Sequence, residues 1–387
     1  MNPRPLEPST PRTLFVNKTY ANFDGGEKSK SLSDLCLELL SEQKNSWQEL
    51  KDAYESLKYV REREVPCRGF SVRIQYNPGR IRSSLADVRE NNVNERPCLL
   101  CLNNLPEDQK GIIYRKAYLI LCNPAPVFSS HFTISHLHHC PQTIAENINT
   151  FLQLMADFGD RWAVLYNGSK CGASAPDHLH FQVIPSGQMP IEKEIREEKR
   201  LTMITLADGV LLYRARALGR EIIILEGDDP IAVANVFKSF LVALKKSLLA
   251  DYHGQAHGNL SSEHCEREGV APAAWLTEGA TCLRADTHRQ TQAPVVDDEP
   301  MMNIAGFFDV GKWHLLIFPR AKHRPEVFFR EGDARVVLSP AVIEMGGVLI
   351  TPVEKDFERL DASFVEGIFG EVSLKGKTVD GAIGTMT

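Results

Sequence analysis

The stretch "GASAPDHLHFQVIP", between residues 172 and 185, constrains the fold more than any other part of the chain. Two histidines and a glutamine stand at every second position, His178, His180 and Gln182, with apolar residues between them. Successive side chains of a β-strand point to opposite faces, so this alternation predicts a half-buried strand with one polar, imidazole-bearing face. A loop rich in Gly, Ala and Ser comes directly before the strand, and the two features have to be explained together.

The other elements predict an α+β protein with two structural units, because 387 residues exceed one ordinary core. In the first unit, "YLILC" and "HFTIS" read as strands, Thr143-x-x-Glu146 as the capping box of a helix, and "WAVLYN" as the strand that follows. The order begins again with "VLLYRA", "EIIILE" and a helix that Asp229-Pro230 opens and that runs through Leu249. "WHLLIFPRAKHRP" is a weak internal echo of "HFTISHLHHCP".

The expected boundaries follow this order. Residues 1–65 form an N-terminal extension with a helix over 33–60, residues 66–200 the first unit, and residues 201–387 the second. A polar, weakly periodic insertion near 251–300 interrupts the second unit.

The composition excludes several classes of protein. A formal charge of −6 carries no basic excess, so nucleic acid is not an expected partner. No window approaches the roughly 18 apolar residues of a membrane span, and the N-terminus has no signal-peptide core, which predicts a cytoplasmic protein. Nine cysteines with a single CxxC, Cys98 and Cys101, favour reduced thiols and a metal over a disulfide framework.

The residue types of the quoted stretch suit phosphate chemistry. A neutral imidazole can attack phosphorus, accept a proton or bind a metal, and Gln182 can donate to a phosphate oxygen. Gly168, Gly172, Ala173 and Ser174 are small enough for backbone N–H groups to approach a phosphate closely. Earlier in the chain, an Asn77-Pro78-Gly79 turn presents Arg80 and Arg82, as an anion clamp or as a solvated pair. The alternative, two histidines that merely face solvent, does not account for the loop, the CxxC and four further histidines at positions 131, 136, 138 and 139.

Several motifs, taken together, resemble the HIT superfamily, in the branch of galactose-1-phosphate uridylyltransferase and the GDP-hexose phosphorylases. "HLHFQ" resembles the His-x-His-x-Gln of that branch, and the resemblance extends from about residue 70 to 352. The other matching segments are "IQYNPGRIR", "RPCLLC", "HFTISHLHH", "NGSKCGASAPDHLHFQ", "LLIFPRAKHRP" and "SPAVIEMGGVLITP". The resemblance implies a HIT-like fold of two tandem repeats, with mainly antiparallel sheets flanked by helices, arranged as an intrachain pseudo-dimer.

The resemblance also implies a role for individual residues. His180 would be the nucleophile, Gln182 would hold a phosphate oxygen, and Ser174 with nearby amides would stabilise developing charge. The phosphate-binding residues would be Arg80, Arg82, Asn167 and Gly172. A structural zinc would be bound by Cys98, Cys101, His139 and His178. Two alternatives stay open at this point, a metal-free site and replacement of His139 by His138.

The implied activity is nucleotidyl transfer through a nucleotidyl-histidine, with phosphorolysis of a GDP-hexose as first choice. Nucleotide-sugar and phosphate would be the substrates. The alternatives are a dinucleoside polyphosphate phosphorylase or adenylyltransferase and, in a different class, a catalytically silent nucleotide-binding or zinc-binding module. "VIEMGGVLITP" stands where a second His-x-His strand is expected, so we expect one catalytic site per chain. A doubled chain could still pair with a second copy through apolar surface.

Overall fold

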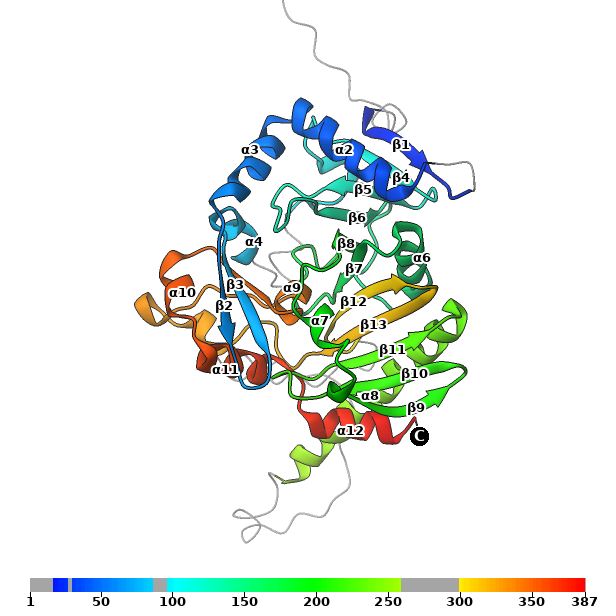
Figure 1. The fold of residues 1–387 in the computed structure, drawn as a ribbon, viewed down its shortest axis with the longest axis vertical. Helices are drawn as coiled ribbons and strands as arrows, with labels where there is room; N and C mark the ends of the chain where they lie inside the picture. The colour runs from blue at the N-terminus through cyan, green and yellow to red at the C-terminus, as the bar shows by residue number, and fades with distance from the viewer. Residues whose placement is uncertain (1–16, 27–29, 86–95, 259–298, 387) are drawn as a thin grey trace, which may run out of the picture.

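The structure, a computed structural model, describes residues 17–26, 30–85, 96–258 and 299–386 (Figure 1). The strands are β1 Thr19–Phe23, β2 Arg61–Pro66, β3 Ser71–Tyr76, β4 Gly111–Tyr114, β5 Tyr118–Cys122, β6 Phe132–His136, β7 Trp162–Asn167, β8 His180–Pro185, β9 Leu201–Ala207, β10 Val210–Ala215, β11 Ile223–Gly227, β12 Met302–Asp309, β13 Lys312–Pro319 and β14 Val348–Thr351. The α-helices are α2 Leu32–Ser46, α3 Gln48–Ser56, α4 Ile81–Ser84, α6 Ile148–Phe158, α7 Ile191–Glu194, α8 Pro230–Gly258, α9 Val342–Met345, α10 Glu354–Arg359, α11 Ala362–Val372 and α12 Gly376–Gly384.

One large sheet organises the molecule, in the order β1-β4-β5-β6-β8-β7-β12-β13-β11-β10-β9. Its neighbouring strands are antiparallel, except for β1 and β4, which are parallel. Strands β7 and β12 meet at the centre, where Asn167 pairs with Asn303. The predicted α+β class, with a mainly antiparallel sheet flanked by helices, is confirmed.

The two halves of the large sheet share one order of elements. The first half runs β4, β5, β6, helix α6, β7, β8, and the second runs β9, β10, β11, helix α8, β12, β13. By this order β13 is the counterpart of β8. In β8 and β13 a histidine opens a six-residue run that a proline closes, "HFQVIP" from His180 and "HLLIFP" from His314.

This order corrects two expectations about the second half. The segment "VIEMGGVLITP" is not the counterpart of the active strand, because it forms α9 and β14. Strand β14 pairs in parallel with β3, in a separate sheet of order β14-β3-β2. The echo of "HFTIS" in "WHLLIF" was also misaligned, since β13 corresponds to β8 and not to β6.

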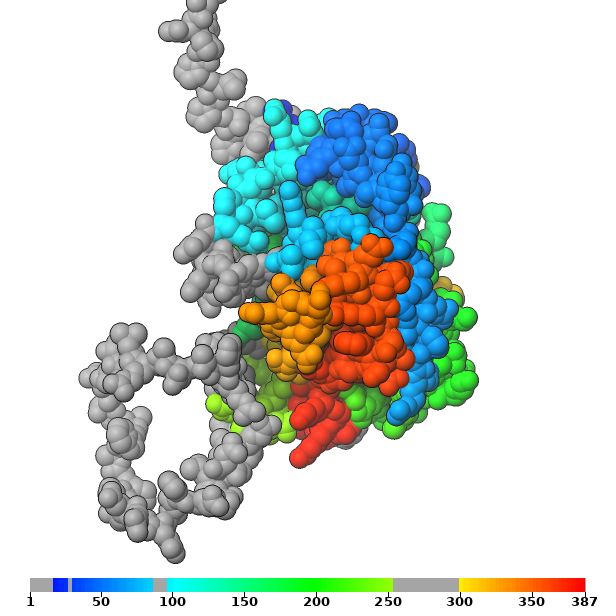
Figure 2. Space-filling view, turned by 90° about the vertical axis from the view of Figure 1, so that its left-hand side faces the viewer, coloured from blue at the N-terminus to red at the C-terminus, as the bar shows by residue number. Residues whose placement is uncertain are grey.

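The large sheet is covered on both faces. Helices α2, α6, α8 and α12 pack one face, where Phe151, Phe181 and Phe237 lie in one continuous core. The other face packs against β3, β14, α9 and α11, through residues such as Leu165, Leu349 and Phe369. The C-terminal segments therefore lie against N-terminal ones, and Figure 2 shows the orange and red part of the chain beside the blue. This second face is the one that carries His180 and Gln182.

Helix boundaries differ from the sequence predictions in places. The helix predicted over 33–60 is broken at Trp47, which is extended (φ −125°, ψ 100°) and buried, so that α2 and α3 are separate. Asp229 does begin α8, since its carboxylate accepts from the Ile231 N–H at 2.9 Å, but the helix continues to Gly258 rather than Leu249. Most of the predicted 251–300 insertion, residues 259–298, lies outside the described residues. Within the described chain, the helices are all too short or too polar to cross a membrane.

Candidate active site and metal centre

The site is built on strand β8, between β6 and β7. Phe181 and Val183 point into the helix-covered core, which leaves His180 and Gln182 on the opposite face. His180 pairs with Ser135 of β6, and Gln182 pairs with Thr133 of β6 and Leu165 of β7. The predicted alternation holds for His180 and Gln182, but His178 lies outside the strand, because β8 begins at His180. The predicted half-buried polar face is also largely covered, since His180 is only 4% exposed.

The environment of His180 sets which ring nitrogen carries the proton. Its Nδ1 lies 2.8 Å from the carbonyl oxygen of His178, and a carbonyl can only accept, so Nδ1 is the protonated nitrogen. Nε2 then holds the lone pair, and it makes no hydrogen bond within the described chain. Burial lowers the pKa of His180 to about 4, which keeps the ring neutral near pH 7. A neutral imidazole with a free Nε2 lone pair is a nucleophile or a base.

Gln142 holds the backbone of His180 in place. Its side-chain oxygen accepts from the His180 N–H at 2.7 Å, and its Nε2 donates to the His180 carbonyl at 3.0 Å. The same Nε2 donates to the carbonyl of Asn167 at 2.8 Å, which ties the end of β7 to the start of β8. Gln142 is 1% exposed, so these bonds do not compete with water. A single buried amide therefore connects two residues of the candidate site.

Gln182 is oriented by His131. The Nδ1 atom of His131 accepts from the Val127 N–H at 3.3 Å, so its Nε2 is the donor and lies 3.1 Å from Gln182 Oε1. Because the oxygen of Gln182 is occupied in this way, its amide nitrogen remains free to donate to a ligand. Burial, together with the charge of Arg80, lowers the pKa of His131 to about 3, which keeps His131 neutral.

Arg80 belongs to the same side of the site. Its Nη1 donates to the Ala125 carbonyl at 2.6 Å, while its buried Nε has no partner in the described chain. A buried guanidinium with a free N–H suits an anion. Arg82, by contrast, is exposed on α4, and no contact joins it to His180 or Gln182 in the described structure.

Asn167 and Gly172 face the C-terminal segment. The Oδ1 atom of Asn167 accepts from Asn303 Nδ2 and from the Val342 N–H, each at 2.8 Å. Gly172 has φ +100°, and a Cβ there would lie 2.6 Å from the Cβ of Ala341. A glycine is therefore required at position 172 by the close approach of Ala341, whatever a ligand requires.

Ser174 is placed by its backbone, since its carbonyl accepts from Arg96 Nη2 at 2.7 Å. Within the described chain, its hydroxyl makes no contact with His180, so the two are not joined directly. The loop before β8 is thus held from two sides, by Arg96 at Ser174 and by Ala341 at Gly172.

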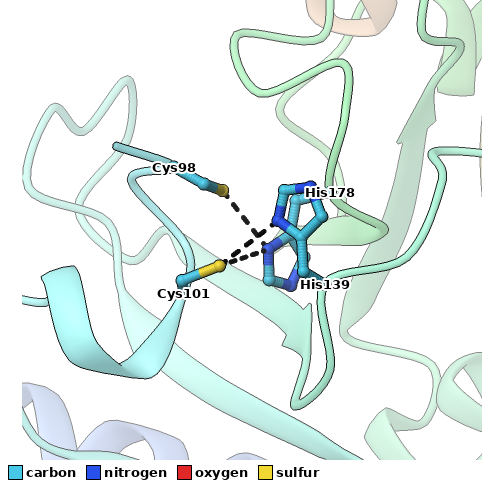
Figure 3. A group of neighbouring side chains, drawn as sticks. All are labelled: Cys98, Cys101, His139 and His178. Atoms are coloured by element: carbon cyan, nitrogen blue, oxygen red, sulfur yellow. Dashed lines mark hydrogen bonds between the residues drawn. The ribbon is translucent and has the colours of Figure 1, made fainter. Parts of the chain in front are cut away.

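The predicted metal ligands come together beside this site (Figure 3). Cys98, Cys101, His139 and His178 have ligand atoms that all lie within 4.8 Å of one another. The Sγ atom of Cys101 lies 3.3 Å from His139 Nδ1 and 3.6 Å from His178 Nδ1, and Cys98 Sγ lies 3.3 Å from His178 Nδ1. A tetrahedron with zinc bonds of 2.0–2.3 Å has edges of roughly 3.3–3.8 Å. His138 is exposed and outside this group, so His139 is the histidine that the fold places there.

The far nitrogens of both histidines have oxygen partners. His178 Nε2 donates to the His136 carbonyl at 2.7 Å, and His139 Nε2 lies 3.5 Å from the carboxylate of Asp177. Such partners keep the proton on Nε2 and leave Nδ1 as the metal-binding atom. Burial and the neighbouring Cys98 raise the pKa of the Cys101 thiol to about 11, so deprotonation there requires a positive charge such as a metal ion. The four residues fit a divalent metal with a preference for sulfur and nitrogen.

Several residues of the site were not found from the sequence. Two of them could have been noticed locally: Gln142 is a polar residue after a predicted strand, and His131 belongs to the cluster of four histidines. Asn303, Ala341 and Val342 come from the second half, and no spacing in the sequence connects them to β8.

Residues 39–185 match the model of a domain family of unknown function, DUF4922, a range that runs from α2 to the end of β8. A search of curated proteins finds no match.

Among solved structures, the chain is similar to yeast Ap4A phosphorylase Apa2, with 14% identity and a TM-score of 0.47 over 86% of this chain and 97% of that one. It is also similar to an ADP-glucose phosphorylase from Arabidopsis thaliana, with 14% identity and a TM-score of 0.31 over 81% of this chain and 100% of that one. A DUF4931 family protein from Bacillus cereus matches at 11% identity and a TM-score of 0.31, over 55% of this chain and 86% of that one. At these identities and TM-scores the similarities are remote and assign no activity.

Proposed function

We propose that this protein is a nucleotidyltransferase in which His180 forms a covalent nucleotidyl-histidine and passes the nucleotidyl group to inorganic phosphate. The observation that carries the proposal is the Nδ1–H of His180 held by the His178 carbonyl, which leaves a neutral ring with its Nε2 lone pair free. A pure binding module needs donors for phosphate but has no need of such a nucleophile.

In the first step, Nε2 of His180 attacks the α-phosphorus of a nucleoside diphosphate sugar. The Nε2–P bond forms, the bond from phosphorus to the bridging oxygen breaks, and sugar 1-phosphate leaves. The ring becomes positively charged, and the His178 carbonyl on Nδ1–H stabilises that charge. The free amide nitrogen of Gln182 donates to a nonbridging oxygen, and Arg80 neutralises phosphate charge.

In the second step, an oxygen of inorganic phosphate attacks the same phosphorus. The Nε2–P bond breaks, nucleoside diphosphate leaves, and His180 returns to its neutral form. Asn167, Gly172 and Ser174 would line the phosphate path through the loop before β8, and Arg82 would act at its exposed edge.

Zinc is the metal we propose for Cys98, Cys101, His139 and His178, in a structural role. When bound, it would fix His178, whose carbonyl in turn orients the ring of His180. The metal would thereby join the CxxC segment, the turn after β6 and the start of β8. We place the protein in the cytoplasm, where such thiols stay reduced and available to a metal.

For the substrate we propose a GDP-hexose first. A dinucleoside polyphosphate is the second candidate, because the same nucleophile and phosphate donors would serve a longer phosphate bridge. The names of the similar solved structures, an Ap4A phosphorylase and an ADP-glucose phosphorylase, widen the panel of compounds to test.

The test is intact-protein mass spectrometry after brief incubation, without phosphate, with GDP-hexoses, UDP-hexoses, ADP-glucose, ATP and diadenosine tetraphosphate. His180→Ala is compared with His314→Ala, which removes the histidine of the same register in the second half. We expect a nucleoside monophosphate adduct on the wild type and on His314→Ala, and none on His180→Ala. The mass of the adduct names the nucleobase. An adduct that survives in His180→Ala would refute the mechanism.

A further inference from the structure

A second polar groove lies away from the candidate active site. It is formed where β10 ends and at the junction of α11 and α12, and it has a volume of about 500 Å³. We name it the α12 groove, and its lining is Arg214–Glu221, Gly370 and Ser373–Gly376. None of these residues belongs to the site on β8 or to the metal group.

The charge of the α12 groove is positive. It is lined by four basic residues, Arg214, Arg216, Arg220 and Lys375, and one acid, Glu221. Arg214 is already paired with two acids, with Glu221 at 2.8 Å and with Asp380, which lies outside the lining. Arg220 is opposed by the buried carboxylate of Glu194, which lies outside the lining. The charges of Arg216 and Lys375 are therefore the ones left without an acidic counterpart in the groove, which favours an anionic ligand.

The N-terminus of α12 adds to this field. This helix of nine residues begins at Gly376, and Lys375 at the N-cap position provides no side-chain cap. The first N–H groups of a helix have no partner within the helix, and they carry a partial positive charge. Gly376 lines the groove, so this end of α12 borders the place where a ligand would lie.

Two buried side chains at the groove also lack partners. Arg220 is 7% exposed and Ser373 is 5% exposed, yet Arg220 Nη2 and Ser373 Oγ make no hydrogen bond in the described chain. The Nη1 atom of Arg220 donates to the Leu218 carbonyl at 2.6 Å, and its Nε donates to the Met345 carbonyl. The guanidinium lies over the ring of Phe369, 4.5 Å from its centroid. The buried carboxylate of Glu194 attracts the positive charge of Arg220 without a hydrogen bond to it. Buried donors are almost always paired in folded proteins, so these two atoms indicate a missing acceptor.

We propose that the α12 groove binds a phosphate dianion, either free or as the phosphoryl group of a phosphomonoester. Two unbalanced cations, Arg216 and Lys375, the end of a helix and two unpartnered donors together match the charge and the acceptor oxygens of phosphate. The volume leaves room for an organic group beside the phosphate. The proposal does not depend on the activity proposed for His180.

The experiment is calorimetric titration of the full chain with inorganic phosphate and, separately, with ribose 5-phosphate. The double variant Arg216→Ala, Lys375→Ala removes two exposed cations of the groove without disturbing buried contacts. Lys377→Ala is the matched control, because Lys377 is an exposed lysine at the same end of α12 that does not line the groove. Each titration is repeated in an Arg80→Ala background, which weakens the anion site proposed on β8.

We expect the double variant to bind phosphate at least roughly tenfold more weakly, since each charge-assisted hydrogen bond contributes about a factor of ten or more. Lys377→Ala should stay within about twofold of the wild type, and binding in the groove should persist in Arg80→Ala. Tighter binding of ribose 5-phosphate than of phosphate would identify a phosphomonoester as the ligand, and equal binding would identify phosphate alone. Binding that is abolished by Arg80→Ala and unchanged in the double variant would overturn the proposal. The absence of any binding outside the site on β8 would overturn it as well.

Discussion

Replacing Gln142 tests how His180 is held. In Gln142→Leu the shape of the side chain is nearly kept, but three hydrogen bonds are lost, to the His180 N–H, the His180 carbonyl and the Asn167 carbonyl. At about 1 kcal/mol for each bond, the free energy of unfolding should fall by about 3 kcal/mol. For a chain of this size that corresponds to a drop of roughly 4 °C in the thermal midpoint.

The same substitution should slow formation of the nucleotidyl-histidine. Gln142 contacts the backbone and no ligand, so the substrate concentration for half-maximal rate should stay near that of the wild type. The maximal rate should fall, by roughly a hundredfold for a displacement of His180 of about 1 Å. The assay is single-turnover adduct formation followed by intact mass, together with thermal unfolding.

Gln153→Leu is the control, because Gln153 is exposed on α6 and, among the described residues, its side chain bonds only to Asp157, at 3.0 Å. It should change neither the midpoint nor the rate. A Gln142→Leu protein with the midpoint of the wild type would show that the three bonds contribute no stability. A rate within about twofold of the wild type would show that Gln142 does not position His180.

Two further predictions concern the metal and the pH. Cys98→Ser should lower the zinc content and the thermal midpoint together. Cys67→Ser is the control, because Cys67 is a half-buried thiol outside the metal group, and it should change neither quantity. If elemental analysis finds the same zinc content in Cys98→Ser as in the wild type, Cys98 is not a ligand. Burial raises the pKa of Glu299 in the folded protein, so folding favours the protonated carboxyl group. The stability that this group contributes is fully present below the unfolded pKa of about 4.3, and it is lost as the pH rises through the pKa of the folded protein. The thermal midpoint of Glu299→Gln, which cannot ionise, should therefore fall less than that of the wild type as the pH rises above about 4.3, and parallel curves would contradict this assignment.

The parts of the site that could be predicted from the sequence are those that depend on neighbouring residues. Alternation is a property of consecutive positions, so the strand with His180 and Gln182 was predicted correctly, but the same pattern wrongly placed His178 in the strand, which begins two residues later. The four residues of the metal group were found through resemblance to a family, and the fold brings them together. Periodicity alone failed at Trp47, where an extended, buried residue separates two helices that share one apolar pattern.

Contacts between distant segments account for most of what was missed. Thr143-x-x-Glu146 predicted a local cap, but α6 begins at Ile148, and the Ile144 N–H donates instead to Glu299, 155 residues away, at 2.6 Å. The Val342 N–H reaches Asn167 over 175 residues. A local pattern cannot reveal which distant backbone group satisfies a donor or an acceptor, because that choice depends on how the sheets pack.

The two halves of the sheet show that position alone does not make a catalytic histidine. His314 has the same position in β13 as His180 has in β8, but the two histidines have different neighbours. His180 pairs with Ser135, whereas His314 pairs with Glu226 of β11. The carboxylate of Glu226 lies 3.6 Å from His314 Nδ1. The cavity beside His314, about 740 Å³, is lined by five carboxylates and one arginine, Arg196. Its lining acids are Asp160, Glu192, Glu198, Glu226 and Asp309. Such a surface repels phosphate, whereas Arg80 and the amide of Gln182 attract it. We therefore expect one nucleotidyl adduct per chain, on His180. The reason is the difference in charge around the two histidines, because the second histidine, His314, is still present.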